Sequence, residues 1–208
     1  MQHGPMARKN GIAGVGENLT IITGMAMVKI VVIFGKLQVL GMTTEHLFAG
    51  EVIGLVELGI TQGCSTGRFC PNESVTRGQM AAFLTRALDL NSPTNMDSFD
   101  DDDGSIFEND IEALYAAGIT RGCSTDSFCP SSAVSRGEMA AFLVRAFDLP
   151  ESSGDSFSDD DRSFFEADIA ALQTSGVTSG CSTGRFCPDR PVSRQEMAAF
   201  LIRALALN

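Results

Sequence analysis

Apolar residues recur at helical spacing in two kinds of segment along the chain. In residues 105–118, Phe107, Ile111 and Leu114 fall on one face of a helix, and the same pattern returns over residues 163–176. The second kind of segment contains the sequence MAAFL, whose apolar residues also recur three and four positions apart. The two patterns predict two types of helix that alternate along the chain and turn their Met and Phe side chains into a core.

Polar residues next to these stripes predict where the helices begin and end. The first-type helices are expected to start with the capping boxes Ser105-x-x-Glu108 and Ser163-x-x-Glu166, and to stop before Gly118 and Gly176. The second-type helices have Thr or Ser followed three positions later by Gln or Glu, at Thr76–Gln79, Ser135–Glu138 and Ser193–Glu196. The same capping-box argument predicts that they begin at these positions.

The whole pattern repeats three times. Cys64, Cys123 and Cys181 are 59 and 58 residues apart, and the Met and Phe positions keep the same step. A fixed period of this kind indicates one structural unit in three copies. The predicted units are an N-terminal extension over 1–39 and repeats over 40–92, 93–150 and 151–208. The expected fold class is mainly all-α, with helix–loop–helix repeats that either surround a common axis or stack in a row.

Each repeat contains one C-x5-C pair in the loop between its helices: Cys64/Cys70, Cys123/Cys129 and Cys181/Cys187. An even number of cysteines at a repeated local spacing favours three disulfides, each within its own repeat, in an exported protein. Free thiols and metal binding are the alternatives. Metal is disfavoured because zinc sites usually combine C-x2–4-C pairs with a second pair or with nearby histidines.

Composition then argues against two classes of function, nucleic-acid binding and catalysis. The chain of 208 residues has a net charge of −11, so it repels phosphate backbones and nucleic acid is not an expected partner. It contains two histidines, and no nucleophile–base pair or metal triad emerges from the sequence. We therefore expect neither an enzyme nor a cofactor or a bound metal.

An arginine follows the N-cap of each second-type helix, at Arg77, Arg136 and Arg194. A cation at this end opposes the helix dipole by a few tenths of a kcal/mol up to about 1 kcal/mol. Two explanations stay open. The arginine pairs with a carboxylate of the acidic loops, or it holds an anionic ligand together with free backbone N–H groups at the helix start.

At this point the chain resembles the S-layer homology (SLH) family over about residues 46–208. The resemblance rests on the openings FDD (99–101) and FSD (157–159), and on GITQG, GITRG and GVTSG after the first-type helices. It rests most on FCPNESVTRGQMAAFLTRAL, FCPSSAVSRGEMAAFLVRAF and FCPDRPVSRQEMAAFLIRAL. The cysteine pairs resemble a variant seen in actinobacterial members.

The resemblance implies a pseudo-threefold helical bundle with grooves between repeats. It implies a non-catalytic anchor at the cell surface that binds a cell-wall polysaccharide attached to peptidoglycan, in well-studied members a polymer ending in a pyruvylated amino sugar. The family's T-R-A-E arginine corresponds to Arg77, Arg136 and Arg194, its opening Asp to Asp101 and Asp159, and its loop glycine to Gly63, Gly122 and Gly180. The alternative function is a structural or protein-interaction repeat whose arginines pair internally with Asp101 and Asp159.

Two further segments, residues 19–42 and the start of repeat 1, also lead to predictions. The apolar run 19–42 follows Arg8 and Lys9 but is interrupted by Lys29 and Lys36, so a signal or anchor and an irregular or β-like extension both stay open. No membrane insertion is expected for the repeats. Counting back from the acidic opening of repeat 2 reaches Met42, so repeat 1 lacks this Asp and we expect one groove to be weaker than the others.

Overall fold

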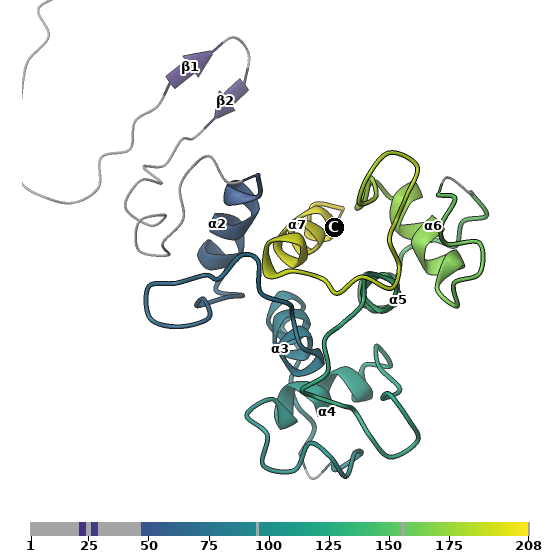
Figure 1. Ribbon diagram of the computed structural model, residues 1–208. Coiled ribbons are helices and arrows are strands. Elements are labelled where there is room, and N and C mark those ends of the chain that lie inside the picture. The colour runs from purple at the N-terminus through teal and green to yellow at the C-terminus, as the bar shows by residue number, and fades with distance from the viewer. Residues whose placement is uncertain (1–20, 24–25, 29–46, 95, 155–156, 208) are drawn as a thin grey trace, which may run out of the picture.

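The computed structural model describes residues 21–23, 26–28, 47–94, 96–154 and 157–207 (Figure 1). Its helices are α2 (Ala49–Glu57), α3 (Arg77–Ala87), α4 (Glu108–Ala116), α5 (Arg136–Ala146), α6 (Glu166–Thr174) and α7 (Arg194–Leu205). A short hairpin precedes them, in which β1 (Ile21–Thr23) pairs antiparallel with β2 (Ala26–Val28). The mainly helical fold is thus confirmed. The rest of the predicted extension, including the apolar residues 30–34, lies outside the described residues.

The second-type helices begin where the sequence predicts. Thr76, Ser135 and Ser193 are the N-caps of α3, α5 and α7, and each capping box has both of its hydrogen bonds. The side-chain oxygen of the N-cap satisfies one backbone donor that the first helical turn leaves free, and the N3 side chain satisfies the N-cap donor.

The capping boxes predicted for the first-type helices are wrong. The helix α4 starts at Glu108 with Phe107 as its N-cap, and α6 starts at Glu166 with Phe165 as its N-cap. The hydroxyl of Ser105 instead accepts a hydrogen bond from the Phe107 N–H at 3.2 Å, within a turn that precedes the helix. Serine side chains compete in this way for nearby backbone donors, and the N-caps lie two residues later than predicted.

The helices pack across repeat boundaries. The close pairs are α3 with α4, α5 with α6, and α7 with α2, so the second helix of each repeat covers the first helix of the next. The third pair joins the last repeat to the first and closes a ring. Figure 1 shows α3, α5 and α7 around the centre, with α2, α4 and α6 outside them. Of the two arrangements left open by the repeat pattern, the structure has the one around a common axis.

A triangle of backbone hydrogen bonds lies on this axis. The Val75 N–H donates to the Val192 carbonyl, Val192 donates to Val134, and Val134 donates to Val75, each at 2.9 Å. All three valines are fully buried. Around them the predicted Met and Phe positions form the core, which confirms their packing role. No helix within the described residues is long and apolar enough to cross a membrane.

All three predicted disulfides are present, and each lies within its own repeat. They join Cys64 to Cys70, Cys123 to Cys129 and Cys181 to Cys187, with Cα atoms 5.9–6.0 Å apart. The second cysteine of each pair has a φ of 57–60°, in the left-handed region. A non-glycine residue adopts this conformation only when its surroundings impose it.

Candidate functional site

Three grooves surround the bundle, and all three repeats contribute to each of them. We name each groove after its arginine. In the Arg77 groove, Arg77 comes from repeat 1, the loop Thr120–Cys123 and helix α5 come from repeat 2, and Phe164 and Phe165 come from repeat 3. The Arg194 and Arg136 grooves have the same construction, rotated by one repeat. No single repeat therefore holds a complete site.

The grooves differ in size. The Arg77 and Arg194 grooves enclose about 380 and 390 Å³, whereas the Arg136 groove encloses about 40 Å³. Two residues that line the small groove are held in ion pairs, Glu196 with Arg190 and Arg203 with Glu51. Within the described residues, the groove at Arg136 is thus much smaller than the other two.

The arginines lie in almost identical surroundings at the junction between successive repeats. The Nε atoms of Arg77, Arg136 and Arg194 donate to the carbonyls of Phe128, Phe186 and Phe69, each at 2.7 Å. Each guanidinium also lies between two phenylalanine rings of the next repeat, 4.7–5.5 Å from their centroids. Burial lowers the pKa of all three arginines, but not enough to remove their charge at neutral pH.

The backbone N–H groups at the helix starts are not free, which removes their part in one of the two explanations left open for the arginine. The N–H groups of Arg77 and Gly78 donate at 2.9 Å to the carbonyls of Ser132 and Pro130 in the next repeat. The corresponding donors of α5 and α7 are used in the same way. These carbonyls neutralise the positive end of the helix dipole, so a cation is tolerated there.

Two of the three arginines have a carboxylate partner. Arg77 pairs with Glu138 and Arg136 pairs with Glu196, both at 3.1 Å. Internal ion pairs are thus present at these two arginines, but the predicted partners in the acidic loops, Asp101 and Asp159, are wrong. The partner is the N3 residue of the next core helix. In α3 this residue is Gln79, which lines the same groove as Arg194.

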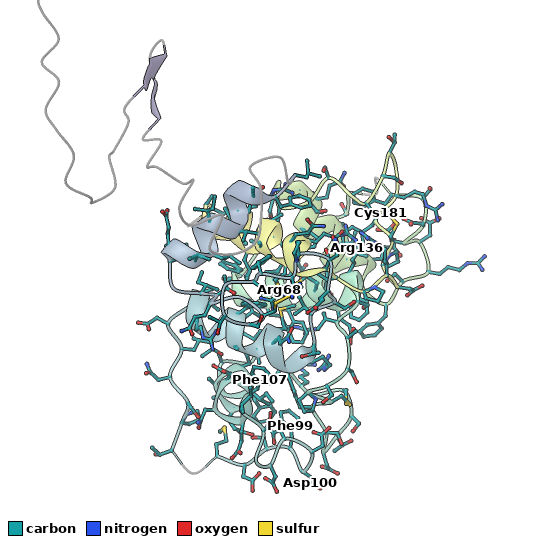
Figure 2. The ribbon with its side chains drawn as sticks, turned by 60° about the vertical axis from the view of Figure 1, so that its left-hand side comes forward. Arg68, Phe99, Asp100, Phe107, Arg136 and Cys181 are labelled. Atoms are coloured by element: carbon teal, nitrogen blue, oxygen red, sulfur yellow. A yellow bond between two sulfur atoms is a disulfide. The ribbon has the colours of Figure 1, made fainter. Side chains whose placement is uncertain are left out.

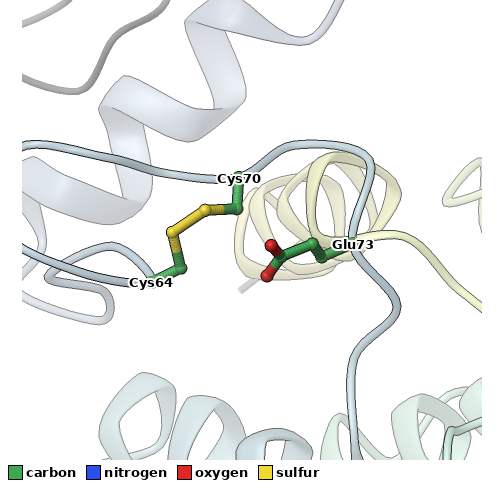
Figure 3. Close-up of side chains that lie close together, drawn as sticks. All are labelled: Cys64, Cys70 and Glu73. Carbon is green, nitrogen blue, oxygen red and sulfur yellow. A yellow bond between two sulfur atoms is a disulfide. The ribbon is translucent and has the colours of Figure 1, made fainter.

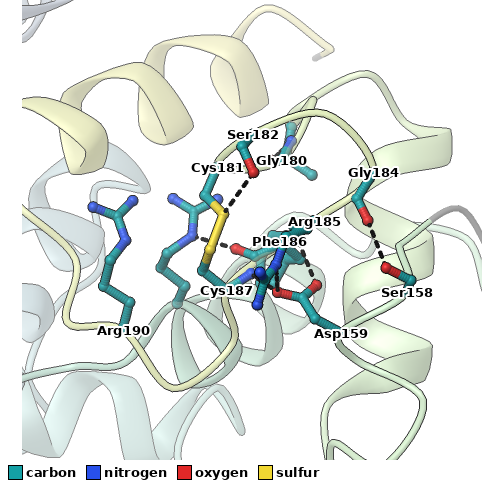
Figure 4. Close-up of a disulfide and its surroundings, with 12 residues drawn as sticks. Ser158, Asp159, Gly180, Cys181, Ser182, Gly184, Arg185, Phe186, Cys187 and Arg190 are labelled. Atoms are coloured by element: carbon teal, nitrogen blue, oxygen red, sulfur yellow. Dashed lines mark hydrogen bonds and ion pairs between the residues drawn. A yellow bond between two sulfur atoms is a disulfide. The ribbon is translucent and has the colours of Figure 1, made fainter.

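Asp101 and Asp159 hold the disulfide loops of their own repeats. Asp101 accepts hydrogen bonds from the N–H groups of Phe128 and Cys129 at 2.6 and 2.8 Å. Asp159 accepts from Phe186 and Cys187 at 2.7 and 3.0 Å, and pairs with Arg185 (Figure 4). The carboxylates stabilise the left-handed second cysteine, which explains why an acid stands there. Neither lines a groove, although Asp101 borders a shallower hollow beside the start of α3.

Gly63, Gly122 and Gly180 do line the grooves, one in each. Their φ angles are 84–97°, and an added Cβ would lie 2.3–2.6 Å from a carbonyl oxygen of the returning loop. Only glycine fits where the two arms of the disulfide loop approach so closely. The glycines therefore shape the groove wall through the backbone.

Exposed apolar residues at the groove lips were missed by the sequence reasoning. Leu47, Ile106 and Phe164 occupy the same position in the three repeats and are 84%, 88% and 91% exposed. Ile106 lines the Arg194 groove and Phe164 lines the Arg77 groove. The sequence does show a recurring apolar residue here, because each of these residues directly precedes the phenylalanine at the start of the first-type helix of its repeat. Figure 2 labels that phenylalanine in repeat 2, Phe107, and also Arg136 of the same repeat.

Each disulfide has a carboxylate beside it, which raises the question of a metal. Glu73 lies next to Cys64 and Cys70, within 4.8 Å of both sulfur atoms (Figure 3). Asp101 and Asp159 lie similarly beside the other two disulfides. Metal coordination by cysteine needs a thiolate, and these sulfur atoms are bonded to each other. The groups as they stand do not offer the ligands of a zinc site.

The geometry defines a closed ring of three interlocked helical repeats with arginine-containing grooves between them. The family model of the S-layer homology domain matches residues 43–81, 98–140 and 156–198, and the chain belongs to the S-layer homology domain family.

The relatives of the chain are surface-layer proteins and enzymes. The chain is 29% identical over 167 residues to the Surface-layer 125 kDa protein of Lysinibacillus sphaericus, covering 76% of this chain and 14% of that protein. It is 32% identical over 152 residues to the Endoglucanase of Bacillus sp. (strain KSM-635), covering 69% and 16%. It is 29% identical over 161 residues to the S-layer protein EA1 of Bacillus anthracis, covering 75% and 19%. The chain thus matches less than one fifth of the length of these relatives.

S-layer homology domains are cell-wall anchoring modules, found in S-layer proteins and in surface enzymes that carry their catalytic domains separately. Membership in the family therefore points to a location at the cell surface or cell wall. It also indicates a non-catalytic module that binds a component of the wall.

Proposed function

We propose that the chain anchors a protein to the cell wall by holding an anionic polysaccharide in its open grooves. The observation that carries the proposal is a buried guanidinium in the wall of each large groove, beside an exposed apolar residue at the lip. A guanidinium recognises carboxylate or phosphate, and an apolar side chain covers the C–H face of a sugar ring. The two together suit an acidic sugar.

The net charge of the chain supports recognition of the polysaccharide at the groove arginines and not over the whole surface. With a net charge of −11 the molecule repels an anionic polymer at long range. Attraction must then come from the grooves, where an arginine buried against phenylalanine rings is screened less than a surface charge. A pyruvylated terminal sugar, which the family resemblance suggests, would present one carboxylate to one guanidinium.

Sedimentation with purified sacculi tests this proposal. We expect the chain to bind sacculi that carry their wall polysaccharide and not sacculi from which hydrofluoric acid has removed it. Binding should weaken in Arg77→Ala or Arg194→Ala, whereas Arg68→Ala, which changes a residue outside the three grooves, serves as the control. Equal binding to intact and stripped sacculi would contradict a polysaccharide ligand.

A structural or protein-interaction role remains the second candidate, and one observation favours it. Arg77 and Arg136 already have carboxylate partners inside the molecule. If all three arginines act only to join repeats, their substitution lowers the stability of the fold while every variant that folds binds sacculi as the wild type does.

A further inference from the structure

Each disulfide loop ends in a short segment on which the core helix of the preceding repeat docks, with repeat 3 preceding repeat 1 in the ring. We call this segment the docking arm. It runs from the phenylalanine before the second cysteine to the buried valine, over residues 69–75, 128–134 and 186–192. Carbonyl groups of each arm accept the arginine Nε–H and the first two backbone N–H groups of the docked helix. The junctions between repeats therefore depend on the backbone path of the docking arms.

The second cysteine of each loop sets the direction of its docking arm. Cys70, Cys129 and Cys187 have φ angles of 57°, 60° and 59°. A residue other than glycine occupies this left-handed region at a cost, so its surroundings have to hold it there. The disulfide is one such restraint in all three loops. If the cysteine is released, the arm turns away and its carbonyls no longer meet the neighbouring helix.

In the loops of repeats 2 and 3, a carboxylate holds the same cysteine. Asp101 accepts the N–H groups of Phe128 and Cys129 at 2.6 and 2.8 Å. Asp159 accepts the two corresponding N–H groups of repeat 3 (Figure 4). These charge-assisted hydrogen bonds do not involve sulfur. The two loops therefore keep a second restraint when the disulfide is broken.

The loop of repeat 1 differs in this respect. Met42 stands where repeat 2 has Asp101, and a thioether is only a weak hydrogen-bond acceptor. Within the described residues, no side chain accepts a hydrogen bond from the N–H of Phe69 or Cys70. The Glu73 carboxylate lies within 4.8 Å of both sulfur atoms (Figure 3), but the other disulfides have a carboxylate equally close. Hydrogen bonds to the arm, and not the charge beside the sulfur atoms, thus distinguish the three loops.

The junction that depends on this loop is the one that closes the ring, between α7 and repeat 1. Arg77 and Arg136 strengthen the other two junctions by pairing with a carboxylate of the next core helix. Arg194 forms no ion pair with any of the described residues. Arg203 and Glu51 do pair across the closing junction, at 3.7 Å, but both are partly exposed and such pairs contribute little. The closing junction therefore relies on the docking arm of repeat 1, and that arm relies on its disulfide.

We propose that the Cys64–Cys70 disulfide is a redox switch that holds the ring closed, and that a thiol reductant at the cell surface opens it. In this exchange two thiols of the reductant are oxidised to one disulfide, the bond between the Cys64 and Cys70 sulfur atoms is cleaved, and two protons pass from the reductant to these cysteines. Both cysteines are only half-buried, so a thiol reaches them from solvent. Cys70 then leaves its left-handed conformation and α7 loses its docking arm.

Opening of this one junction affects every groove, because all three repeats contribute to each of them. A reduced chain should consequently release the cell wall, and re-oxidation should restore binding. This consequence for wall binding rests on the proposed function, whereas the opening of the ring does not. The other two disulfides are backed by Asp101 and Asp159, so their reduction leaves the ring closed.

Graded reduction of the wild-type chain tests the proposal first. The chain is equilibrated with increasing ratios of reduced to oxidised dithiothreitol, free thiols are trapped with iodoacetamide, and the labelled peptides are mapped by mass spectrometry. A loop that stays folded keeps its two thiols close together, which favours re-formation of its disulfide. We expect Cys64–Cys70 to be reduced at a ratio about tenfold lower than the other two pairs. Reduction of all three at one ratio, or of Cys64–Cys70 last, would overturn the proposal.

Hydrogen exchange of backbone amides reports which junction opens. The N–H groups of Arg194 and Gln195 are bonded to the docking arm of repeat 1, and we call them the ring-closing amides. The N–H groups of Arg136 and Gly137 are bonded in the same way to the docking arm of repeat 3, and we call them the reference amides. Local opening of a junction accelerates the exchange of its own amides.

Two matched variants each remove one disulfide. In Cys64→Ser/Cys70→Ser we expect the ring-closing amides to exchange about tenfold faster or more, and the reference amides to change by less than about threefold. In Cys181→Ser/Cys187→Ser both sets of amides should change by less than about threefold, because Asp159 still holds the arm. Equal acceleration in the two variants would contradict the proposal. The graded reduction uses the wild-type chain, so it decides the question even where a variant does not fold.

A further variant gives the loop of repeat 3 the features of the loop of repeat 1. Asp159→Met, added to Cys181→Ser/Cys187→Ser, removes both restraints on the docking arm, and the reference amides should now exchange about tenfold faster. Asp159→Met with the disulfide intact should leave them slow, as the ring-closing amides are in the wild type. If Asp159→Met has no effect in the absence of the disulfide, the carboxylate is not the second restraint and the proposed difference between the loops is wrong.

Sedimentation with intact sacculi separates the switch from the proposed function. We expect the oxidised wild type and Cys181→Ser/Cys187→Ser to bind, and the wild type reduced at Cys64–Cys70 to be released. Binding that persists while the ring-closing amides exchange rapidly would show that the switch does not control anchoring. Absence of binding by the oxidised wild type would instead remove the anchoring function, and the order of reduction and the exchange rates would still decide whether the ring opens.

Discussion

Arg77 and Arg136 each join one repeat to the next through three kinds of contact. Arg77 donates to the Phe128 carbonyl, pairs with Glu138 and lies against two phenylalanine rings. A helix-dipole argument alone predicts that removing this cation leaves the fold intact or makes it slightly more stable. The contacts reverse that expectation, because they belong to the junction between repeats and the helix dipole is already neutralised by loop carbonyls.

Arg77→Ala should therefore lower the free energy of unfolding by about 2–4 kcal/mol, since it leaves a buried carbonyl and Glu138 without their partner. Urea denaturation followed by circular dichroism measures the change. Arg121→Ala, at an exposed position on the same groove, should change it by less than about 0.5 kcal/mol. Equal stability of the two variants would show that the junction does not depend on the arginine.

Asp102 is an acid buried in the opening loop of repeat 2, and one of its oxygens has no hydrogen-bond partner. Burial, followed by the nearby charges of Glu112, Glu108 and Asp101, raises its pKa to about 6. Between about pH 4 and pH 6 the folded state therefore binds a proton more tightly than the unfolded state does. By linkage, this group makes the fold progressively less stable as the pH rises through that window.

Asp102→Asn should remove this pH-dependent penalty. We expect the variant to exceed the wild type in stability by about 1–2 kcal/mol at pH 7, and the difference to fall away below about pH 4. Thermal unfolding across this pH range provides the measurement, with the exposed Asp103→Asn as the control. A stability difference that does not vary with pH would show that ionisation of Asp102 is not the cause.

The phenylalanines at the starts of α4 and α6 each pack on the core helix of the preceding repeat. An added Cβ at Gly78 or Gly137 would lie 2.5 Å from a ring carbon of Phe107 or Phe165. Glycine normally weakens a helix by about 1 kcal/mol relative to alanine. At these positions the missing side chain is what permits the ring to approach.

Gly137→Ala should consequently destabilise the protein by about 1–3 kcal/mol, because overpacking exceeds the gain in helix propensity. Gly50 is the matched control, as it lies in α2 with no atom within 4 Å of an added Cβ. Gly50→Ala should stabilise the fold by up to about 1 kcal/mol. Melting temperatures that rise in both variants would argue against the ring contact.

Prediction of the helices from the sequence succeeded where local contacts decide their ends. The capping boxes of α3, α5 and α7 are formed within four residues, and so are the C-terminal turns at Gly118 and Gly176, whose φ angles are 72° and 76°. The starts of α4 and α6 were predicted two residues too early. Their phenylalanine N-caps pack on helices of the preceding repeat, and local sequence does not reveal such a contact.

The ring is held closed by contacts between the first and last repeats. Helix α7 packs on α2, and the Val75 N–H donates to the Val192 carbonyl. Arg194 reaches the Phe69 carbonyl, 125 residues away in the chain. Each repeat thus depends on both others, unlike the repeats of an open solenoid, which contact only their neighbours.

A fragment of residues 47–150 lacks α6 and α7, so it should not fold cooperatively. It exposes the core faces of α2 and α5 and loses two bonds of the valine triangle. We expect a broad urea transition and binding of a hydrophobic dye, compared with one sharp transition for residues 47–208. A sharp transition of the fragment would show that two repeats form a stable unit.

The three-repeat organisation, the two helix types, the second-type helix ends and the local disulfides followed from the sequence, because each depends on residues close together in the chain. The Asp, Gly and Arg positions could be picked out, but their roles could not be assigned from spacing alone. Tertiary structure decided that Arg77 meets Glu138, 61 residues away, and that Asp101 supports a disulfide loop. It also decided that, within the described residues, the groove at Arg136 is much smaller than the other two. Repeats of nearly the same apolar pattern stack equally well in a row or in a ring, and only closure of α7 on α2 determines which side chains of different repeats meet.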